Sequence, residues 1–405
     1  MIIRSFGCEQ YKVFRDLTSV ELRPLTLFFG KNSSGKSALL RLLRLLLRAA
    51  SGRFLHQGFP LEVDGLSYGE NFQDLIHGRL PHGKLRLDLA LEEGGRAFDF
   101  SATVQNVSDA GLYRPVLSHA RLVAEGRPSE WSSDLASVAS GPADFTGVWP
   151  QEWLQTTSEQ TALQNQVHLW RTKIANLESR LTHLGPIRAQ ARSVYRPAAP
   201  SVLSFDGNGF INWLAKEPDL LQQVGEWFAV HLNGWRLKLD PSGPFVESVL
   251  HKGGVSINMA NTGQGMQQVL PVVVLQLAHR LGTEPFLDLV EEPESSLHAA
   301  AQAALGDLFL ETAQRGHGQV LVETHSENLL LRIRRRIAEG QAEPDQVALY
   351  WIEDCPEGHS KIKRIDIAGD GSVEAWPEGV FSEDYQEVRA LQRANLQRAK
   401  QENRA

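Results

Sequence analysis

A glycine-rich segment near the start of the chain has the residue types of a phosphate-binding loop. Residues 30–37 read Gly-Lys-Asn-Ser-Ser-Gly-Lys-Ser and match the pattern G-x-x-x-x-G-K-[ST] in full. Glycines let such a loop turn its backbone N–H groups toward phosphates, and a following helix adds the positive end of its dipole. Lys36 would reach the β- and γ-phosphates, and the Ser37 hydroxyl would bind Mg²⁺. We therefore predict an ATP and Mg²⁺ site whose nucleotide contacts come from Gly30, Asn32, Ser33, Ser34, Gly35, Lys36, Ser37 and Ala38.

Adjacent carboxylates follow a short apolar run in the second half of the chain. Residues 285–290, Pro-Phe-Leu-Asp-Leu-Val, lead directly into Glu291 and Glu292. A hydrolytic phosphate-loop site needs one carboxylate for the metal ion and another to polarise the attacking water. We assign Glu291 to the metal shell and Glu292 to the catalytic base. For the pair taken alone, the alternative is an acidic loop at a sheet edge.

A histidine ends a further apolar run, Val-Leu-Val-Glu-Thr-His-Ser at residues 320–326. A lone histidine is more often a structural residue than a catalytic one. Its place at a strand end after the acidic pair favours a γ-phosphate-sensing role for His325. His298 is the weaker candidate for such a role.

Two glycines precede the apolar helix that begins near Val269. Residues 261–268 read Asn-Thr-Gly-Gln-Gly-Met-Gln-Gln, and glycines with polar side chains at a helix N-terminus form an anion-binding nest. The phosphate loop already serves the nucleotide of its own chain. We therefore predict that Gly263, Gln264 and Gly265 contact the nucleotide of a second copy, while a tight turn before the helix is the simpler alternative.

The elements that must position these residues alternate between strands and helices. Apolar periodicity predicts a strand at 25–29, a helix at 38–50, an antiparallel hairpin at 84–106, a helical layer at 151–184, a helix at 209–232, strands at 234–239 and 245–258, a helix at 269–280, a strand at 285–290, a helix at 296–314, a strand at 319–323 and a helix at 327–339. This alternation is typical of an α/β fold with a mostly parallel sheet. Residues 107–150 receive no assignment.

Composition narrows the class of protein. The chain has 405 residues, of which 42% are hydrophobic and 22% charged, as in ordinary globular proteins. A net charge of −7 argues against a surface coated with phosphate-binding lysines, although it leaves room for a local basic groove. Cys8 and Cys355 cannot form a disulfide framework, and no signal segment or long apolar stretch occurs. We expect a reduced, soluble, cytoplasmic protein without membrane association.

The order of these motifs resembles that of ABC-type ATPases. Within them, the chain is similar to bacterial RecF/OLD/SMC-like ATPases that are grouped with AAA proteins, lack long coiled coils and occur in anti-phage defence systems. Segments at 66–78, 184–195 and 370–381 also resemble family segments, the last being a C-terminal domain of unknown function. The resemblance spans most of the chain. It implies an α/β ABC-type head with a mixed sheet, an antiparallel β subdomain, a helical insertion and a small C-terminal element.

The same resemblance implies a domain division and residue roles. The expected regions are an N-terminal ATPase lobe at 1–110, a helical insertion with the Q-loop at 111–200, a C-terminal ATPase lobe at 201–345, and a small C-terminal domain with a polar tail at 346–405. Lys36, Glu292 and His325 would be catalytic. Ser37, Glu291 and Gln190 would hold the metal, with Arg188 as the alternative to Gln190.

Four positions depart from the family pattern. They are Gln264 and Gln267 beside the signature glycines, and Val380 and Ser382 near the C-terminus. These departures concern the rate of hydrolysis more than nucleotide binding.

We carry three hypotheses for the role of the ATPase. The first is the ATPase sensor subunit of a defence or DNA-transaction complex, a homodimer closed around two Mg-ATP, with higher oligomers left open and the effector on a separate protein. The second is a DNA-binding repair clamp. The third is a module that ATP locks with little hydrolysis. Basic residues for the second are Arg41, Arg44, Arg48, Arg332, Arg334, Arg335, Arg336, Arg389, Arg393, Arg398 and Lys400, for which solvated helix faces are the alternative.

A nuclease site is not expected. Some OLD-family relatives carry a Toprim nuclease, which needs a glutamate after a strand and a later Asp-x-Asp. Glu353, Asp354 and Asp366 do not form that pattern convincingly.

Overall fold

The computed structural model describes residues 1–53, 58–109, 112–133, 145–154, 162–199, 203–374, 376 and 390–391. Its centre is a six-stranded sheet in the order β12-β16-β17-β3-β18-β19. The strands are β12 (Leu181–Leu184), β16 (Phe286–Glu291), β17 (Gly318–Thr324), β3 (Leu25–Gly30), β18 (Val347–Cys355) and β19 (His359–Ile365). All neighbours pair in parallel except β18 and β19. Every residue of β3 and of β16 is buried, as expected for parallel strands covered on both faces.

Helices cover both faces of this sheet. Phe28 and Leu321 pack on the face that carries α1 (Lys36–Ser51). Leu27 and Val322, one residue away on their strands, pack with α7 (Gln264–Leu281), α8 (Ala299–Ala313) and α9 (Glu327–Ala338). Because side chains of a strand alternate between faces, the continuous apolar runs predicted from the sequence serve two separate cores.

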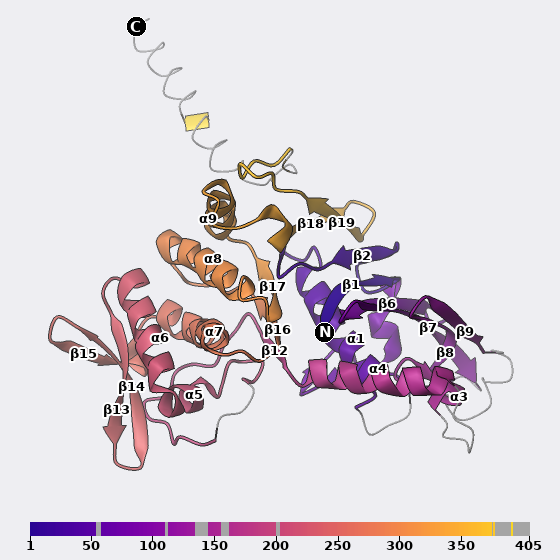
Figure 1. The fold of residues 1–405 in the computed structure, drawn as a ribbon, viewed down its shortest axis with the longest axis horizontal. Coiled ribbons are helices and arrows are strands. Elements are labelled where there is room, and N and C mark those ends of the chain that lie inside the picture. Colours follow the sequence, from indigo (N-terminus) through magenta and orange to yellow (C-terminus); the bar gives the residue numbers. More distant parts are fainter. Residues whose placement is uncertain are drawn as a thin grey trace, which may run out of the picture.

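A second, antiparallel sheet encloses α1 on its outer side (Figure 1). Its strand order is β2-β1-β6-β7-β8-β9. The bounds are β1 (Ile2–Glu9), β2 (Thr18–Glu21), β6 (Lys84–Glu93), β7 (Arg96–Asp109), β8 (Leu112–Ala124) and β9 (Arg127–Ser132). Helix α4 (Ala162–Glu178) joins the same core, where the rings of Phe98 and Trp170 lie 4.5 Å apart. The Trp149 indole donates to the Ala50 carbonyl (2.8 Å) and ties the end of α1 to this layer.

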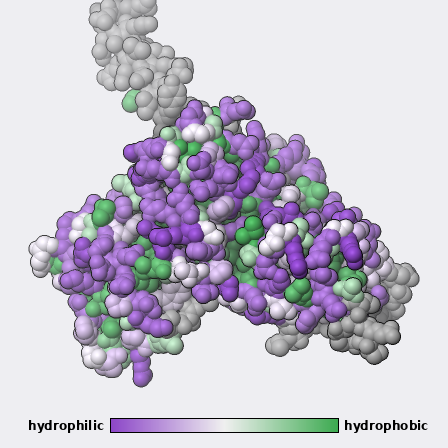
Figure 2. All heavy atoms as spheres, in the orientation of Figure 1, coloured by the Kyte–Doolittle hydropathy of each residue, from purple (hydrophilic) through white to green (hydrophobic). Residues whose placement is uncertain are grey.

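A helical lobe lies on the other side of the main sheet (Figure 1). It contains α5 (Phe210–Lys216), α6 (Pro218–His231), α7 and the antiparallel strands β13 (Arg236–Ser242), β14 (Phe245–Lys252) and β15 (Val255–Asn258). The face seen in Figure 2 is mainly hydrophilic, with apolar residues in small groups. Short elements complete the described chain: β4 (Glu62–Val63), β5 (Leu66–Ser67), η1 (Phe72–Leu75), η2 (His77–Arg79), β10 (Phe145–Thr146), β11 (Trp149–Pro150), α3 (Gln151–Leu154), η3 (Met259–Asn261) and η4 (Pro344–Gln346).

The α/β class and the mixed sheet with an antiparallel subdomain are confirmed. Three expectations need correction. The helical layer predicted to reach residue 184 ends at Glu178, and Leu181–Leu184 is the edge strand β12. The prediction failed because the periodicity of so short an apolar run cannot distinguish a buried strand from a helix. Region 111–200, expected to be helical, begins with β8 and β9 of the antiparallel sheet. Residues Val347–Ile365, expected in a separate C-terminal domain, form β18 and β19 of the main sheet, with β18 directly beside β3.

The segment after β19 docks on α9. Arg334 donates to the carbonyl of Gly371 (2.8 Å), and its guanidinium lies 5.1 Å from the ring centroid of Trp376. A Cβ on Gly371 would lie 2.4 Å from the Arg334 carbonyl oxygen, so a glycine is needed for this approach. The departures at Val380 and Ser382 lie outside the described residues. Within the described part of the chain, no helix is long and apolar enough to span a membrane.

Candidate nucleotide-binding site

The phosphate loop connects β3 to α1, and two of its glycines are required by its geometry. A Cβ on Gly30 would lie 2.5 Å from the carbonyl oxygen of Ile352, on the neighbouring strand. Gly35 precedes α1 with φ 104°, a left-handed conformation that favours glycine. Between them, Asn32 and Ser33 are exposed and Ser34 is buried, while Ala38 lies half-buried in the first turn of the helix.

The side chain of Lys36, the first residue of α1, lies against the backbone of the loop. Its Nζ donates to the carbonyl oxygens of Gly30 (3.0 Å) and Lys31 (2.8 Å), and only 3% of the residue is exposed. Burial lowers the pKa of Lys36, and the carboxylates of Glu323, Glu292 and Glu294 partly offset this effect. Charge-assisted bonds to phosphate are stronger than bonds to neutral carbonyls. The Lys36 ammonium therefore lies where it can exchange its contacts with the two carbonyl oxygens for contacts with a phosphate group.

The carboxylate in contact with Ser37 is Glu323, a residue for which no role was expected. Ser37 Oγ donates to Glu323 Oε1 (2.9 Å). Glu292, Glu323 and His325 each offer a ligand atom, and these atoms lie within 4.8 Å of one another. Carboxylate and hydroxyl oxygens are the ligands that Mg²⁺ prefers. Burial, followed by the charge of Glu291, raises the pKa of Glu323 to about 7.

Glu291, the predicted metal ligand, is engaged elsewhere. Its two oxygens accept from Arg41 Nε (2.9 Å) and Nη2 (2.7 Å), and Oε1 also contacts His183 Nε2 (2.9 Å). Only 1% of its side chain is exposed. Burial opposes its ionisation, but the hydrogen bonds from His183 and Arg41 outweigh that cost and lower the pKa of Glu291. The structure thus places this carboxylate in an ion pair with α1, and Glu323 beside Ser37.

Glu292, the predicted base, has an uncommon backbone conformation. Its φ is 43°, in the left-handed region, which costs a non-glycine residue about 1–3 kcal/mol. Its N–H donates to the Glu323 carbonyl (2.9 Å), and its carboxylate accepts from Ser295 Oγ (3.3 Å). The turn that begins here directs the Glu292 carboxylate toward Glu323 and His325. Strain of this kind is concentrated at functional sites.

His325 follows β17, and its backbone is held by a third carboxylate. Its N–H donates to Glu294 Oε1 (2.6 Å). Glu294 is buried, and this burial raises its pKa. Burial also lowers the pKa of His325, with the Lys36 charge acting in the same direction. The imidazole is therefore neutral near pH 7, and its N–H can donate a hydrogen bond to a phosphate oxygen.

The predicted signature residues begin α7. Gly263 is the N-cap of this 18-residue helix, and both Gly263 and Gln264 are exposed. A Cβ on Gly265 would lie 2.3 Å from the carbonyl oxygen of Ser296, so the helix start packs closely on the turn after the acidic pair. The contact of Gly263, Gln264 and Gly265 with the nucleotide of a second copy stays a prediction.

The Q-loop candidates differ in position. Gln190 is exposed, whereas Arg188 is 1% exposed and donates to the carbonyl oxygens of Glu291 (2.5 Å) and Glu292 (3.1 Å). The residue that reaches the site is Arg188. Its long-range contacts could not be found from sequence spacing.

The basic residues of α1, proposed as DNA contacts, point into the protein. Arg41 pairs with Glu291, while Arg44 and Arg48 both pair with Asp64 (2.9 and 2.8 Å). These guanidinium groups bind carboxylates of their own chain. Their helical spacing reflects packing between the two sheets.

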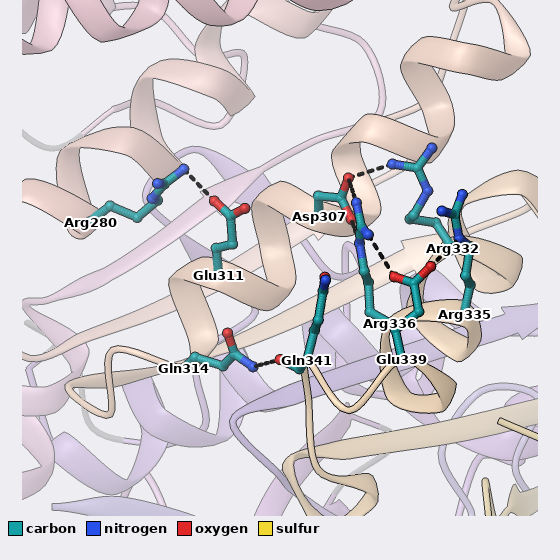
Figure 3. Close-up of polar contacts among 9 residues, drawn as sticks. All are labelled: Arg280, Asp307, Glu311, Gln314, Arg332, Arg335, Arg336, Glu339 and Gln341. Atoms are coloured by element: carbon teal, nitrogen blue, oxygen red, sulfur yellow. Dashed lines mark hydrogen bonds and ion pairs between the residues drawn. The ribbon is translucent and has the colours of Figure 1, made fainter. Parts of the chain in front are cut away.

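Three of the basic residues of α9 are paired with carboxylates (Figure 3), while Arg334 contacts Gly371 and Trp376. Asp307 of α8 accepts from Arg332 and Arg336, and Glu339 accepts from Arg335 and Arg336. This network supports the interpretation of a solvated helix face. Arg389, Arg393, Arg398 and Lys400 lie outside the described residues.

Residues 25–332 match the family described as "AAA domain, putative AbiEii toxin, Type IV TA system". A protein named OLD nuclease, from Thermus scotoductus (strain ATCC 700910 / SA-01), is 21% identical over 339 residues, which cover 78% of this chain and 58% of that protein. The chain thus spans less than two thirds of that relative.

Solved structures of SMC heads show a distant likeness. The SMC head domain from Thermotoga maritima has 12% identity and a TM-score of 0.45, with 91% of this chain and 100% of that chain covered. An SmcHead bound to the C-winged helix domain of ScpA has 13% identity and a TM-score of 0.48, with 90% and 98% covered.

Proposed function

Because this chain belongs to the family described as "AAA domain, putative AbiEii toxin, Type IV TA system", we propose that it binds and hydrolyses Mg-ATP between two copies of itself. In this proposal it is the ATPase subunit of a bacterial defence or DNA-transaction complex whose effector is a separate protein. The nucleotide acts as a switch: binding closes the pair of heads, and hydrolysis opens it.

The observation that carries this proposal is the convergence of one loop and two strand ends. Lys36 and Ser37 begin α1 after the loop that follows β3, His325 follows β17, and Glu292 follows β16. Ser37 contacts Glu323, and Glu323 lies with Glu292 and His325 in one cluster. Parallel strands bring their carboxyl ends to the same edge of a sheet, where ligands of open α/β sheets bind.

Each side chain then has a role in hydrolysis. Lys36 leaves the loop carbonyls and binds the β- and γ-phosphates, and His325 contacts the γ-phosphate. Ser37 and Glu323 would hold Mg²⁺, which would neutralise phosphate charge. Glu292 orients and polarises the attacking water. Glu291, paired with Arg41 and His183, holds β16 and α1 together behind the site.

The exposed start of α7 supports the paired arrangement. Four N–H groups at a helix start have no partner within the helix and bind anions. Gly263 and Gln264 are exposed at this helix start, and no acidic residue occurs in the first turn. The phosphate loop supplies the phosphate contacts of its own chain, so this second nest suits the nucleotide of a partner copy.

The test is the solution mass of the Glu292→Gln variant with and without Mg-ATP. This variant should bind nucleotide but not hydrolyse it, so the mass should double when Mg-ATP is added. The unmodified protein should hydrolyse ATP and form the pair only transiently. Lys36→Ala, the control, should bind weakly and stay single. A Glu292→Gln protein with unchanged mass would refute the paired arrangement, and a wild type without turnover would leave only an ATP-locked module.

The family description and the arginine contacts bear on the biological role. The family description names a toxin of toxin–antitoxin systems, which favours defence over repair. The internally paired arginines of α1 and α9 give less support to a DNA clamp. Nuclease activity is named for the OLD relative, of which this chain covers 58%. Salt-dependent binding of the purified protein to duplex DNA, with and without ATP, separates these roles, because a defence subunit with a separate effector should show none.

A further inference from the structure

Arg188, in the loop after β12, is buried without a carboxylate partner among the described residues. Its guanidinium instead donates to two backbone carbonyls, those of Glu291 (2.5 Å) and Glu292 (3.1 Å). Burial lowers the pKa of Arg188 to about 10. The charges of Glu294, Glu291 and Glu292 partly offset this effect, but a buried guanidinium without an ion pair is still costly, which points to a specific role.

The backbone of Arg188 is bound from the opposite direction by α7. Gln268 Oε1 accepts from the Arg188 N–H (2.8 Å), and Gln268 Nε2 donates to the Arg188 carbonyl (2.7 Å). Gln267 repeats the contact, accepting from the Ala191 N–H (2.9 Å) and donating to the Thr262 carbonyl (3.0 Å). The two glutamines therefore fix the loop to the first turns of the helix. This contact also gives Gln267 a reason to differ from the family pattern.

Arg188 thus joins two parts of the site that are far apart in the chain. At one end is the start of α7, where Gly263 and Gln264 are exposed. At the other is Glu292, whose strained backbone is held by its N–H bond to the Glu323 carbonyl and by its own carbonyl, which accepts from Arg188 (3.1 Å) and from the Ser295 N–H (3.3 Å). A displacement of α7 would move the Arg188 backbone, and with it the guanidinium that holds the Glu292 carbonyl.

We propose that Arg188 is a positioning residue that aligns the Glu292 carboxylate when the start of α7 closes on the nucleotide of a second copy. This inference rests on the proposed function, since it assumes hydrolysis at Glu292. It explains how contact with a partner can control hydrolysis without any partner residue reaching the attacking water. The bound state of α7 is transmitted through Gln268 and Arg188 to the turn after β16.

The test compares Arg188→Met, Arg188→Lys and Gln268→Met with Arg192→Met, an exposed arginine of the same loop. Arg188→Met should lower kcat about 100-fold, because small displacements of a catalytic group have effects of this size, while KM for ATP changes little. Arg188→Lys should restore part of kcat, since lysine can reach one carbonyl. Gln268→Met should resemble Arg188→Met, and the double variant should be no worse than either. Arg192→Met should behave as wild type.

A second readout does not depend on turnover. In the nucleotide-free protein, hydrogen exchange at the Glu292 amide should be faster in Arg188→Met and Gln268→Met than in wild type or Arg192→Met. Unchanged exchange, or equal losses in kcat and in nucleotide affinity, would overturn the positioning role. If exchange changes as expected but the wild type shows no hydrolysis, the proposed function fails and the structural link between α7 and Glu292 stands.

Discussion

Glu323 is a buried carboxylate whose ionisation should destabilise the folded protein when no metal ion is bound. Burial raises the pKa of Glu323 to about 7 from an ordinary value of 4.5, and only 2% of the residue is exposed. An acid whose pKa is raised on folding destabilises the native state as pH rises through the window between the unfolded and folded values, here about 4.5 to 7. The cost is complete above pH 7.

The magnitude follows from the shift. A difference of about 2.5 pKa units, at 1.36 kcal/mol per unit, corresponds to about 3 kcal/mol at pH 8 and about 1 kcal/mol at pH 5. Glu323→Gln keeps the shape of the side chain and an oxygen that can accept from Ser37, but it carries no charge. The variant should therefore be more stable than wild type by up to about 3 kcal/mol at pH 8, with most of the difference lost at pH 5.

The assay is urea unfolding of nucleotide-free wild type, Glu323→Gln and Glu353→Gln at both pH values. Glu353 is an exposed carboxylate of β18, so its substitution should change stability little at either pH. Mg-ATP should then stabilise wild type more than Glu323→Gln, because the amide is a poor replacement for a metal-binding carboxylate. A Glu323→Gln protein that is less stable than wild type at pH 8, or equally stabilised by Mg-ATP, would refute the reasoning.

Two further predictions concern other parts of the chain. Arg41→Met should lower the free energy of unfolding by about 3 kcal/mol, because it leaves the buried Glu291 without its ionic partner; urea unfolding checks this, with the 62%-exposed Arg335→Met expected to change stability by less than about 1 kcal/mol. A thiol reagent should label Cys355 rapidly and Cys8 only on unfolding, since Cys8 is fully buried and burial raises its pKa. Peptide mapping after labelling checks this, and early modification of Cys8 would contradict it.

The resemblance to OLD-like ATPases grouped with AAA proteins is confirmed by the family match and by the OLD relative. The motifs that carried it were readable because their geometry is local. A loop that wraps phosphates needs glycine at Gly30 and Gly35 whatever surrounds it, and the structure shows why at each position. The apolar runs before Lys36, Glu292 and His325 likewise identified strands that end at the site.

The partner of each charged side chain could not be read in this way. Hydrogen bonds such as Ser37 to Glu323 or Arg188 to Glu292 join residues separated by 286 and 104 positions. They depend on strand order, and the position of β17 between β16 and β3 decides that Glu323 meets Ser37 while Glu291 pairs with Arg41.

The sequence by itself therefore determined the phosphate loop, the acidic pair and the α/β class, because residue type and spacing dictate local backbone geometry and periodicity. Only the tertiary structure decided which carboxylate stands beside the metal-binding hydroxyl, that β18 lies beside β3 in the main sheet, and that the arginines of α1 and Arg332, Arg335 and Arg336 of α9 are paired with carboxylates of the chain. The physical reason is that electrostatic and hydrogen-bond partners are chosen by distance in space, which packing sets after the strands have been ordered.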